Sequence, residues 1–194
     1  QSIDRLNMMN LHDYLGFDTK LNAKFNRIIL MDRLPNDKFI PFKQFCARFT
    51  QLTSLTLDRS VMSLAKLSQA LCQLSCLVEL DLNGYNFVDE TTTTSPPREK
   101  FTPLSSIRLL CLDGSISHHQ SVRLAIAIAN IFPNVQVLNI PRCQDLYHQC
   151  SGANQAEECR RLQLEPFIDG GRCTQLHTIA LINGRGVPFG TLLF

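Results

Sequence analysis

Residues 74–82 read Leu-Ser-Cys-Leu-Val-Glu-Leu-Asp-Leu, and they give the clearest copy of a pattern that recurs along the chain. Apolar residues stand at the first, fourth, seventh and ninth positions of this stretch. Its second half alternates apolar and polar residues, which is typical of a short strand with one buried face. The stretch therefore predicts a strand that buries Leu80 and Leu82 on one side.

The same spacing occurs five more times. Four copies are Phe49, Leu52, Leu55, Leu57; Leu104, Ile107, Leu110, Leu112; Phe132, Val135, Leu138, Ile140; and Cys173, Leu176, Ile179, Leu181, and a weaker copy, with a polar first residue, is Asn22, Phe25, Ile28, Leu30. The six first residues lie 27, 25, 30, 28 and 41 positions apart. One such unit cannot bury its own apolar face, so a period of this size predicts stacked copies and a parallel sheet. Most copies are separated by about 16 to 21 residues, enough for a crossover helix with turns.

This pattern resembles the leucine-rich repeat superfamily over roughly residues 22–184. The residues three positions beyond the last strand residue of five copies are Ser60, Tyr85, Ser115, Cys143 and Gly184. Cys or Ser at this position resembles the intracellular, cysteine-containing and ribonuclease-inhibitor-like classes. The resemblance implies an α/β fold, a leucine-rich repeat solenoid of about six irregular repeats. Its curved parallel β-sheet would lie on the concave side, with helices and loops on the convex side.

The domain organisation predicted from these copies is a single solenoid over 22–184. A loop insertion lies at 89–100, where the sequence is polar and of low complexity, and a long insertion lies at 143–172. Residues 1–21 are an N-terminal helical flank or part of a preceding repeat, and 185–194 are a C-terminal tail. Because the chain begins with Gln and has no polar closing helix, we expect a fragment of a longer protein or an incomplete gene model.

Three crossover helices are predicted from apolar residues at helical spacing. The first buries Phe42, Phe45, Cys46 and Phe49, and begins near Pro41. The second buries Leu64, Leu67, Ala70, Leu71 and Leu74, with Ser60 or Ser63 as its N-cap. The third runs over 122–131, with Ser117 or Ser121 as its N-cap, and a further helix is predicted near 155–164.

The composition bounds the classes of function. The chain has 194 residues, 44% of them hydrophobic, and a formal net charge of +2, so no general affinity for nucleic acid or membrane follows. It holds 8 Cys, but neither an N-x-[ST] sequon nor a signal-peptide pattern nor an apolar run long enough to span a bilayer. A cytoplasmic or nuclear protein with free thiols is expected.

Catalytic and metal-binding motifs are scarce in this sequence. Cys143, His148, Cys150 and Cys159 could hold a structural Zn²⁺ in the long insertion, but the C-x2-C knuckle of strong zinc signals is missing. Ordinary reduced thiols are the favoured alternative. No phosphate loop, nucleophile elbow or H-E-x-x-H occurs. We therefore expect no enzyme, no cofactor, no metal and no small-molecule substrate.

The strand residues between the apolar ones would form three rows on the concave face. The first row is Arg27, Ser54, Glu79, Leu109, Val137 and Thr178; the second is Ile29, Thr56, Asp81, Cys111, Asn139 and Ala180; the third is Met31, Asp58, Asn83, Asp113, Pro141 and Ile182. Acids cluster in the middle copies with no basic residue beside them in these rows, and the C-terminal half is apolar. The candidate partner-binding residues are Asp58, Glu79, Asp81, Asp113, Leu109, Val137 and Asn139. Four acids on one face would favour a basic partner segment, with the apolar patch as its anchor. The alternative is that these are only solvated strand positions, with the acids keeping the sheet soluble.

By resemblance, the chain is a non-catalytic protein–protein interaction module. It is similar to the repeat regions of F-box/leucine-rich-repeat proteins, which implies substrate recognition in a ubiquitin ligase, with the F-box outside this chain. One alternative is a ribonuclease-inhibitor-like or innate-immune sensor module. Another is a nucleic-acid adaptor similar to the repeat domains of RNA export factors, which the near-neutral charge and the acidic face oppose. The expected partner is a protein, not nucleic acid or a membrane.

Overall fold

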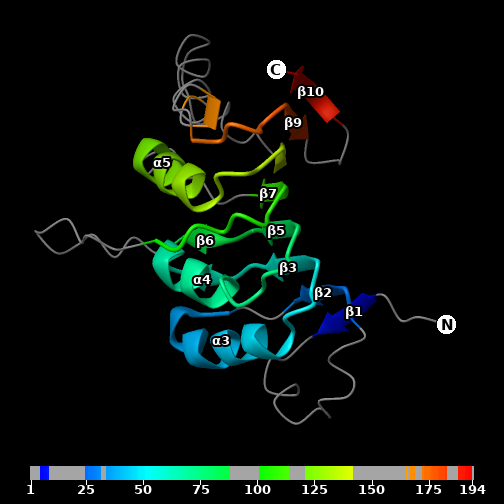
Figure 1. Cartoon of the computed structure of the whole chain (residues 1–194), viewed down its shortest axis with the longest axis vertical. Helices are drawn as coiled ribbons and strands as arrows, with labels where there is room; N and C mark the ends of the chain where they lie inside the picture. The colour runs from blue at the N-terminus through cyan, green and yellow to red at the C-terminus, as the bar shows by residue number, and fades with distance from the viewer. Residues whose placement is uncertain are drawn as a thin grey trace, which may run out of the picture.

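The computed structural model describes residues 5–8, 25–31, 34–87, 101–113, 121–141, 165, 167–168, 172–182 and 188–193, and Figure 1 shows their arrangement. The strands of the main sheet are β1 (Arg5–Met8), β2 (Arg27–Leu30), β3 (Ser54–Asp58), β5 (Glu79–Asn83), β7 (Leu109–Asp113), β8 (Val137–Pro141), β9 (Thr178–Ile182) and β10 (Pro188–Leu193). Two short strands, β4 (Val61–Met62) and β6 (Asn86–Phe87), pair with each other. The helices are the 3-10 helix η1 (Asn36–Lys38), α3 (Phe39–Arg48), α4 (Leu64–Leu71) and α5 (Ser121–Ile131).

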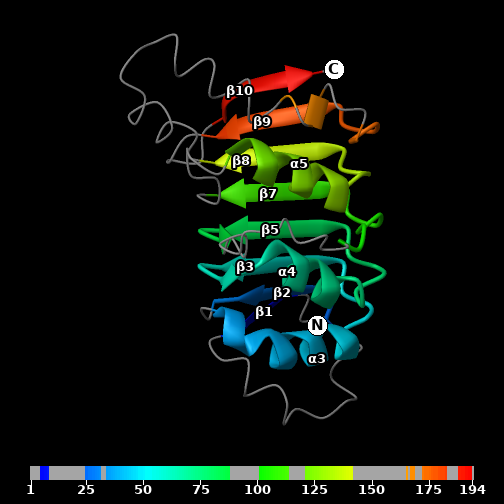
Figure 2. The ribbon, with the colours of Figure 1, turned by 90° about the vertical axis from the view of Figure 1, so that its left-hand side faces the viewer.

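The main sheet has eight strands in the order β1-β2-β3-β5-β7-β8-β9-β10, so neighbours in space follow one another along the chain. Every pairing from β1 to β9 is parallel, and β10 returns antiparallel to β9. Helices α3, α4 and α5 lie in the crossovers between these parallel strands, and all three lie on the same side of the sheet (Figures 1 and 2). The predicted α/β class with a parallel sheet is thereby confirmed.

The strand register brings equivalent residues of the sequence copies side by side. Leu55 pairs with Leu80, Leu80 with Leu110, and Leu110 with Leu138, which in turn pairs with Ile179. All five side chains are fully buried. Because side chains alternate between the two faces of a strand, this register puts every such residue on the helix-covered face.

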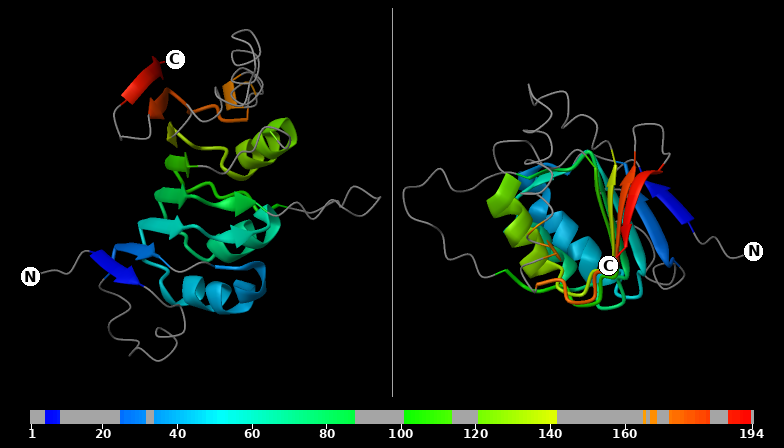
Figure 3. Two further views of the ribbon diagram at one scale, coloured as in Figure 1. Left: turned by 180° about the vertical axis from the view of Figure 1, so that it is seen from behind. Right: turned by 90° about the horizontal axis from the view of Figure 1, so that it is seen from above.

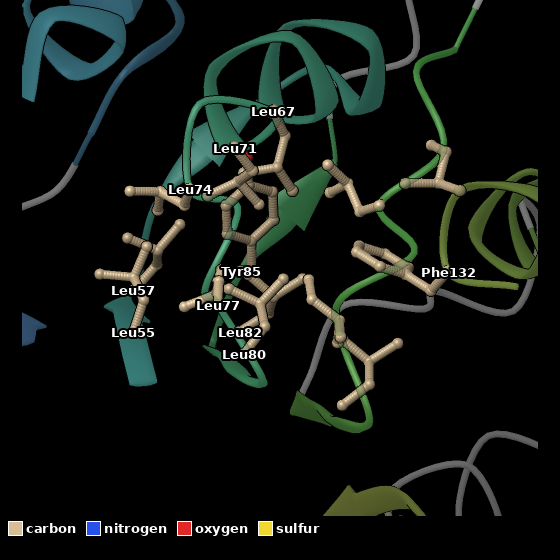
Figure 4. Close-up of a cluster of buried hydrophobic side chains, with 14 of the residues drawn as sticks. Leu55, Leu57, Leu67, Leu71, Leu74, Leu77, Leu80, Leu82, Tyr85 and Phe132 are labelled. Carbon is tan, nitrogen blue, oxygen red and sulfur yellow. The ribbon is translucent and has the colours of Figure 1, made fainter. Parts of the chain in front are cut away.

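The core is built between these strands and the helices. Figure 4 shows Leu67 and Leu71 of α4 and Leu80 and Leu82 of β5 in one buried cluster, with the Tyr85 ring between the two pairs in this view. Each of these side chains is at most 1% exposed. Burying one leucine stabilises the folded state by about 1.5–3 kcal/mol, so the sequence pattern stabilises the sheet largely through this layer.

In five copies of the sequence pattern, the first four residues form a hydrogen-bonded turn that precedes the strand. In each, the backbone N–H of the second apolar residue donates to the carbonyl of the first. The pairs are Leu52 to Phe49 (2.9 Å), Leu77 to Leu74 (3.1 Å), Ile107 to Leu104 (3.4 Å), Val135 to Phe132 (3.4 Å) and Leu176 to Cys173 (3.1 Å). The strands begin two residues after the second apolar residue, as Ser54 and Glu79 show.

The three predicted crossover helices form at the expected places. Phe42, Phe45 and Cys46 are the buried residues of α3, and Pro41 lies in its first turn, where a missing backbone N–H leaves no bond unmade. Helix α4 begins after Ser63, whose side chain accepts a hydrogen bond from the Lys66 backbone N–H at 3.4 Å. This is the N-cap that stabilises the first turn of a helix. Ser121 is the first residue of α5.

Three features differ from the sequence predictions or extend them. Residues 5–8 form a strand parallel to β2, where loose helical spacing predicts a helix. The C-terminal tail forms β10. The sequence did not predict this strand because Pro188 begins it and Gly190 interrupts it, and both residue types are typical of turns. Between β5 and β7, the described residues 84–87 and 101–108 contain no helix. The helix predicted near 155–164 lies outside the described residues.

Candidate functional site

The side of the sheet opposite the helices is the candidate site, and we call it the open face. It is defined by the side chains of two rows across β2, β3, β5, β7, β8 and β9. Seen from above in Figure 3, the helices and the sheet form two layers, and within the described ranges no helix lies on the far side of the sheet. The open face therefore presents strand side chains without a helical layer over them.

The register reproduces the first two predicted rows residue by residue. The first row is Arg27, Ser54, Glu79, Leu109, Val137 and Thr178, and the second is Ile29, Thr56, Asp81, Cys111, Asn139 and Ala180. Arg27 is exposed, Ser54 and Thr56 are 8% and 9% exposed, and the other members are half-buried. The third row is described only in part, because the side chains of Asp113, Pro141 and Ile182 lie outside the described residues; Met31 is 52% exposed.

Two carboxylates stand on β5 in the middle of the open face. Glu79 and Asp81 are two positions apart and so point to the same side, about 6.6 Å apart along the strand. Their register neighbours are small hydroxyl residues on β3, and Leu109 and Cys111 on β7, none of which carries a positive charge. Both carboxylates are half-buried, and the Asp81 Oδ1 atom is shielded from solvent. Solvent and salt screen such charges less than fully exposed ones.

Beyond β5 the first row becomes apolar. Leu109 lies beside Glu79 in register, and Val137 lies beside Leu109. Both are half-buried and lie on the open face rather than in the core. Asn139, in the second row, lies beside Cys111 and Ala180. An acidic strand is thus followed directly by two strands that contribute apolar side chains.

Asp58 interacts with two neighbouring side chains, Asn83 and Arg59, which its position in the third row did not predict. Its Oδ1 atom accepts a hydrogen bond from the Asn83 side-chain amide at 2.7 Å. Its Oδ2 atom lies 3.9 Å from Nε of Arg59, an ion pair whose Arg side chain is 75% exposed. Such an exposed pair contributes little to stability. Arg59 follows the end of β3 and therefore belongs to none of the three predicted rows. One of the acids, Asp58, thus has a basic neighbour that the rows did not include.

The thiols divide into buried and accessible groups. Cys46 and Cys173 are buried, whereas Cys72 is exposed. Burial raises the pKa of the Cys46 thiol above its usual range and raises that of Cys173 to about 11. Buried, protonated thiols of this kind are poor nucleophiles and act as small apolar residues. Among the residues described, no cluster of His, Cys, Asp or Glu could hold a metal, and the set Cys143, His148, Cys150 and Cys159 lies outside them.

Comparison with known proteins identifies no relative: no family model, no curated protein and no solved structure matches the chain. Within the described part of the chain, no helix is both long and apolar enough to cross a membrane.

Proposed function

We propose that the chain is a leucine-rich-repeat-type solenoid that acts as a non-catalytic protein-interaction module, with the open face as its concave binding surface. The repeated turn and strand register support this architecture. Five copies make the same turn between their first two apolar positions, and their strands align at equivalent residues. Stacked units that differ mainly in their crossovers are typical of solenoids.

A second repeated hydrogen-bond pattern supports the same architecture. The residue just before a strand accepts two hydrogen bonds through its backbone carbonyl. The donors are two successive backbone N–H groups at the start of the neighbouring strand that follows it in the chain. The acceptors are Asn26, Thr53, Val78, Arg108 and Gln136, with N···O distances from 2.8 to 3.2 Å. Each acceptor except Asn26 also donates its own backbone N–H to the acceptor of the preceding unit. The successive units from β2 to β9 are thereby joined in the same way.

The observation that carries the binding function is the composition of the open face. Strand side chains that serve only solubility would be polar throughout, whereas this face sets Glu79 and Asp81 beside Leu109 and Val137. Apolar residues bordered by charges are typical of protein-binding surfaces. The carboxylates oppose binding to the phosphate backbone of nucleic acids, because that binding requires clustered Lys and Arg.

The narrower role that we propose is substrate recognition for an F-box-type ubiquitin ligase, in the cytoplasm or nucleus. It rests on the resemblance of the repeated pattern to the repeat regions of that class. In such a module the described strands would bind the substrate, while the ligase-binding part would lie elsewhere in the protein.

The experiment is an affinity pull-down from cell lysate with the wild-type chain and the Glu79→Lys, Asp81→Lys double variant. A third bait carries Gln69→Lys and Gln73→Lys, two exposed positions at α4 on the helix side. Proteins recovered by the wild type are identified by mass spectrometry, and their binding is then measured with purified partners. We expect the wild type and the helix-side variant to retain a protein that the open-face variant loses. Retention of the same partners by all three baits would contradict the proposed binding surface.

A further inference from the structure

The first row of the open face changes chemical character across three adjacent strands. Glu79 on β5, Leu109 on β7 and Val137 on β8 lie side by side in register. Neighbouring strands are about 4.8 Å apart, so the carboxylate position lies about 4.8 Å from the first apolar position and about 9.6 Å from the second. A ligand that crosses these strands meets a negative charge and two apolar side chains within about 10 Å.

On the other side of β5, the side chains next to the half-buried carboxylates are small. Ser54 and Thr56, their register neighbours on β3, are small and buried, so they do not overhang β5. The cation in the first row is Arg27, which lies two strands from Glu79, about 9.6 Å away by the strand spacing. That separation is about one Debye length at physiological salt, so Arg27 weakens the negative potential at β5 without cancelling it.

From this juxtaposition we infer the chemistry of the partner: an extended peptide segment with a Lys or Arg two to four residues from a bulky apolar side chain. This inference rests on the proposed function, and it specifies the kind of peptide segment that the open face binds. In an extended chain, side chains two positions apart lie on one side about 6.6 Å from each other, and four positions apart about 13 Å. The distance of about 9.6 Å from Glu79 to Val137 lies between these two spacings, and the long, bendable Lys or Arg side chain accommodates the shorter distance of about 4.8 Å to Leu109.

The two contacts have separate roles. The apolar side chain packs on Leu109 and Val137 and supplies most of the binding free energy through burial. The basic side chain pairs with Glu79, in the field of Asp81, and sets orientation and selectivity. Because the ion pair is only partly buried, binding weakens as the ionic strength rises but is not abolished.

The test is selection of a phage-displayed library of random dodecapeptides on the full 194-residue chain. Parallel selections use Glu79→Lys and a matched control, Asp37→Lys, which makes the same change of charge at an exposed position before α3. Circular dichroism verifies that both variants fold. We expect the wild type and Asp37→Lys to enrich peptides with the basic–apolar spacing, and Glu79→Lys to bind a selected peptide about tenfold more weakly.

A further variant, Leu109→Glu, separates failure of this inference from failure of the proposed function. Selected peptides that lack a basic residue, yet lose binding on Leu109→Glu, would overturn the partner chemistry and leave the open face as a binding surface. Selected peptides that bind both Glu79→Lys and Leu109→Glu as tightly as wild type would contradict both proposals. If the wild type enriches no peptide at all, the inference of an extended peptide partner is wrong.

Discussion

Asn83 and Asp58 are register neighbours on β5 and β3, and the Asn83 amide donates a hydrogen bond of 2.7 Å to Asp58 Oδ1. The bond links two adjacent copies of the sequence pattern just where their strands end. It also shows that an acid placed on a row by sequence can serve the fold rather than a ligand. Glu79, on the first row of the same sheet, lies in register between Ser54 and Leu109.

The Asn83–Asp58 hydrogen bond predicts energetic coupling between the two residues. In a double-mutant cycle with Asn83→Ala and Asp58→Ala, we expect a coupling energy of about 0.5–1.5 kcal/mol, because the bond is partly buried and its acceptor is charged. Chemical denaturation measures the four free energies of unfolding. Additive effects of the two substitutions would contradict the coupling.

The residues after these two strands have a shared backbone conformation that predicts opposite responses to substitution. Arg59 and Gly84 follow β3 and β5 and have positive φ angles of 51° and 59°. We expect Gly84→Ala to lower the free energy of unfolding by about 1 kcal/mol, since a Cβ is unfavourable there. Arg59→Gly relieves the same strain and should leave stability unchanged or raise it by up to about 1 kcal/mol. Thermal denaturation compares them, and a loss of stability in Arg59→Gly larger than in Gly84→Ala would contradict this account.

Adjacent leucines of β7 test which face of the sheet is the core. Leu110 is fully buried, whereas Leu109 is half-buried on the open face. Leu110→Ala should lower the free energy of unfolding by about 2–5 kcal/mol, as cavity-forming substitutions do. Leu109→Ala, the matched control, should cost less than about 1 kcal/mol. Equal losses in urea denaturation would show that both faces are packed.

The buried thiols predict a loss of stability in alkali. In the folded state the pKa of Cys173 is raised to about 11 by burial, whereas an unfolded thiol titrates near 8.5. Between these values the unfolded state loses a proton that the folded state keeps, so this contribution is complete below the unfolded pKa and falls as the pH rises. Denaturation at several pH values from 8 to 11 should therefore show a smaller decline for Cys173→Ala than for wild type. A decline of equal slope in both would contradict the assignment to Cys173.

Thiol modification provides an independent measurement of the same burial. In the native protein, iodoacetamide should modify exposed Cys72 well before Cys46 and Cys173, which should react only on unfolding. Peptide mass spectrometry gives the rate at each site. Rapid native modification of Cys46 would contradict its burial on the core-facing side of α3.

The strands and the two rows were predictable from sequence because apolar residues recur at fixed offsets. Leu80 and Leu82 identify the buried face of β5, and the same offsets in other copies fix the register that the structure has. Helix α4 was equally predictable from sequence, since Ser63 precedes apolar residues at helical spacing. Such local patterns report burial directly.

Other features depend on contacts that no local pattern records. Strand β1, Arg5–Met8, pairs with β2 and alternates polar and apolar residues, but four residues are too few to distinguish a strand from the helix that the wider apolar spacing suggests. Strand β10 forms by antiparallel return onto β9, with a register shift between Pro188 and Gly190. The Asn83–Asp58 bond and the ion pair of Arg59 arise only when two strands are set side by side. Pairing over long separations, not residue type, decides these features.

The central claim, that a partner binds on the open face, is tested most directly by site-specific photo-crosslinking. Leu109 on the open face and Gln69 on α4 are each replaced in separate chains by p-benzoylphenylalanine, and the chains are irradiated with a purified partner from the pull-down. We predict a crosslinked product from the Leu109 position and none from the Gln69 position. A product from Gln69 alone would place the partner on the helix side and contradict the account.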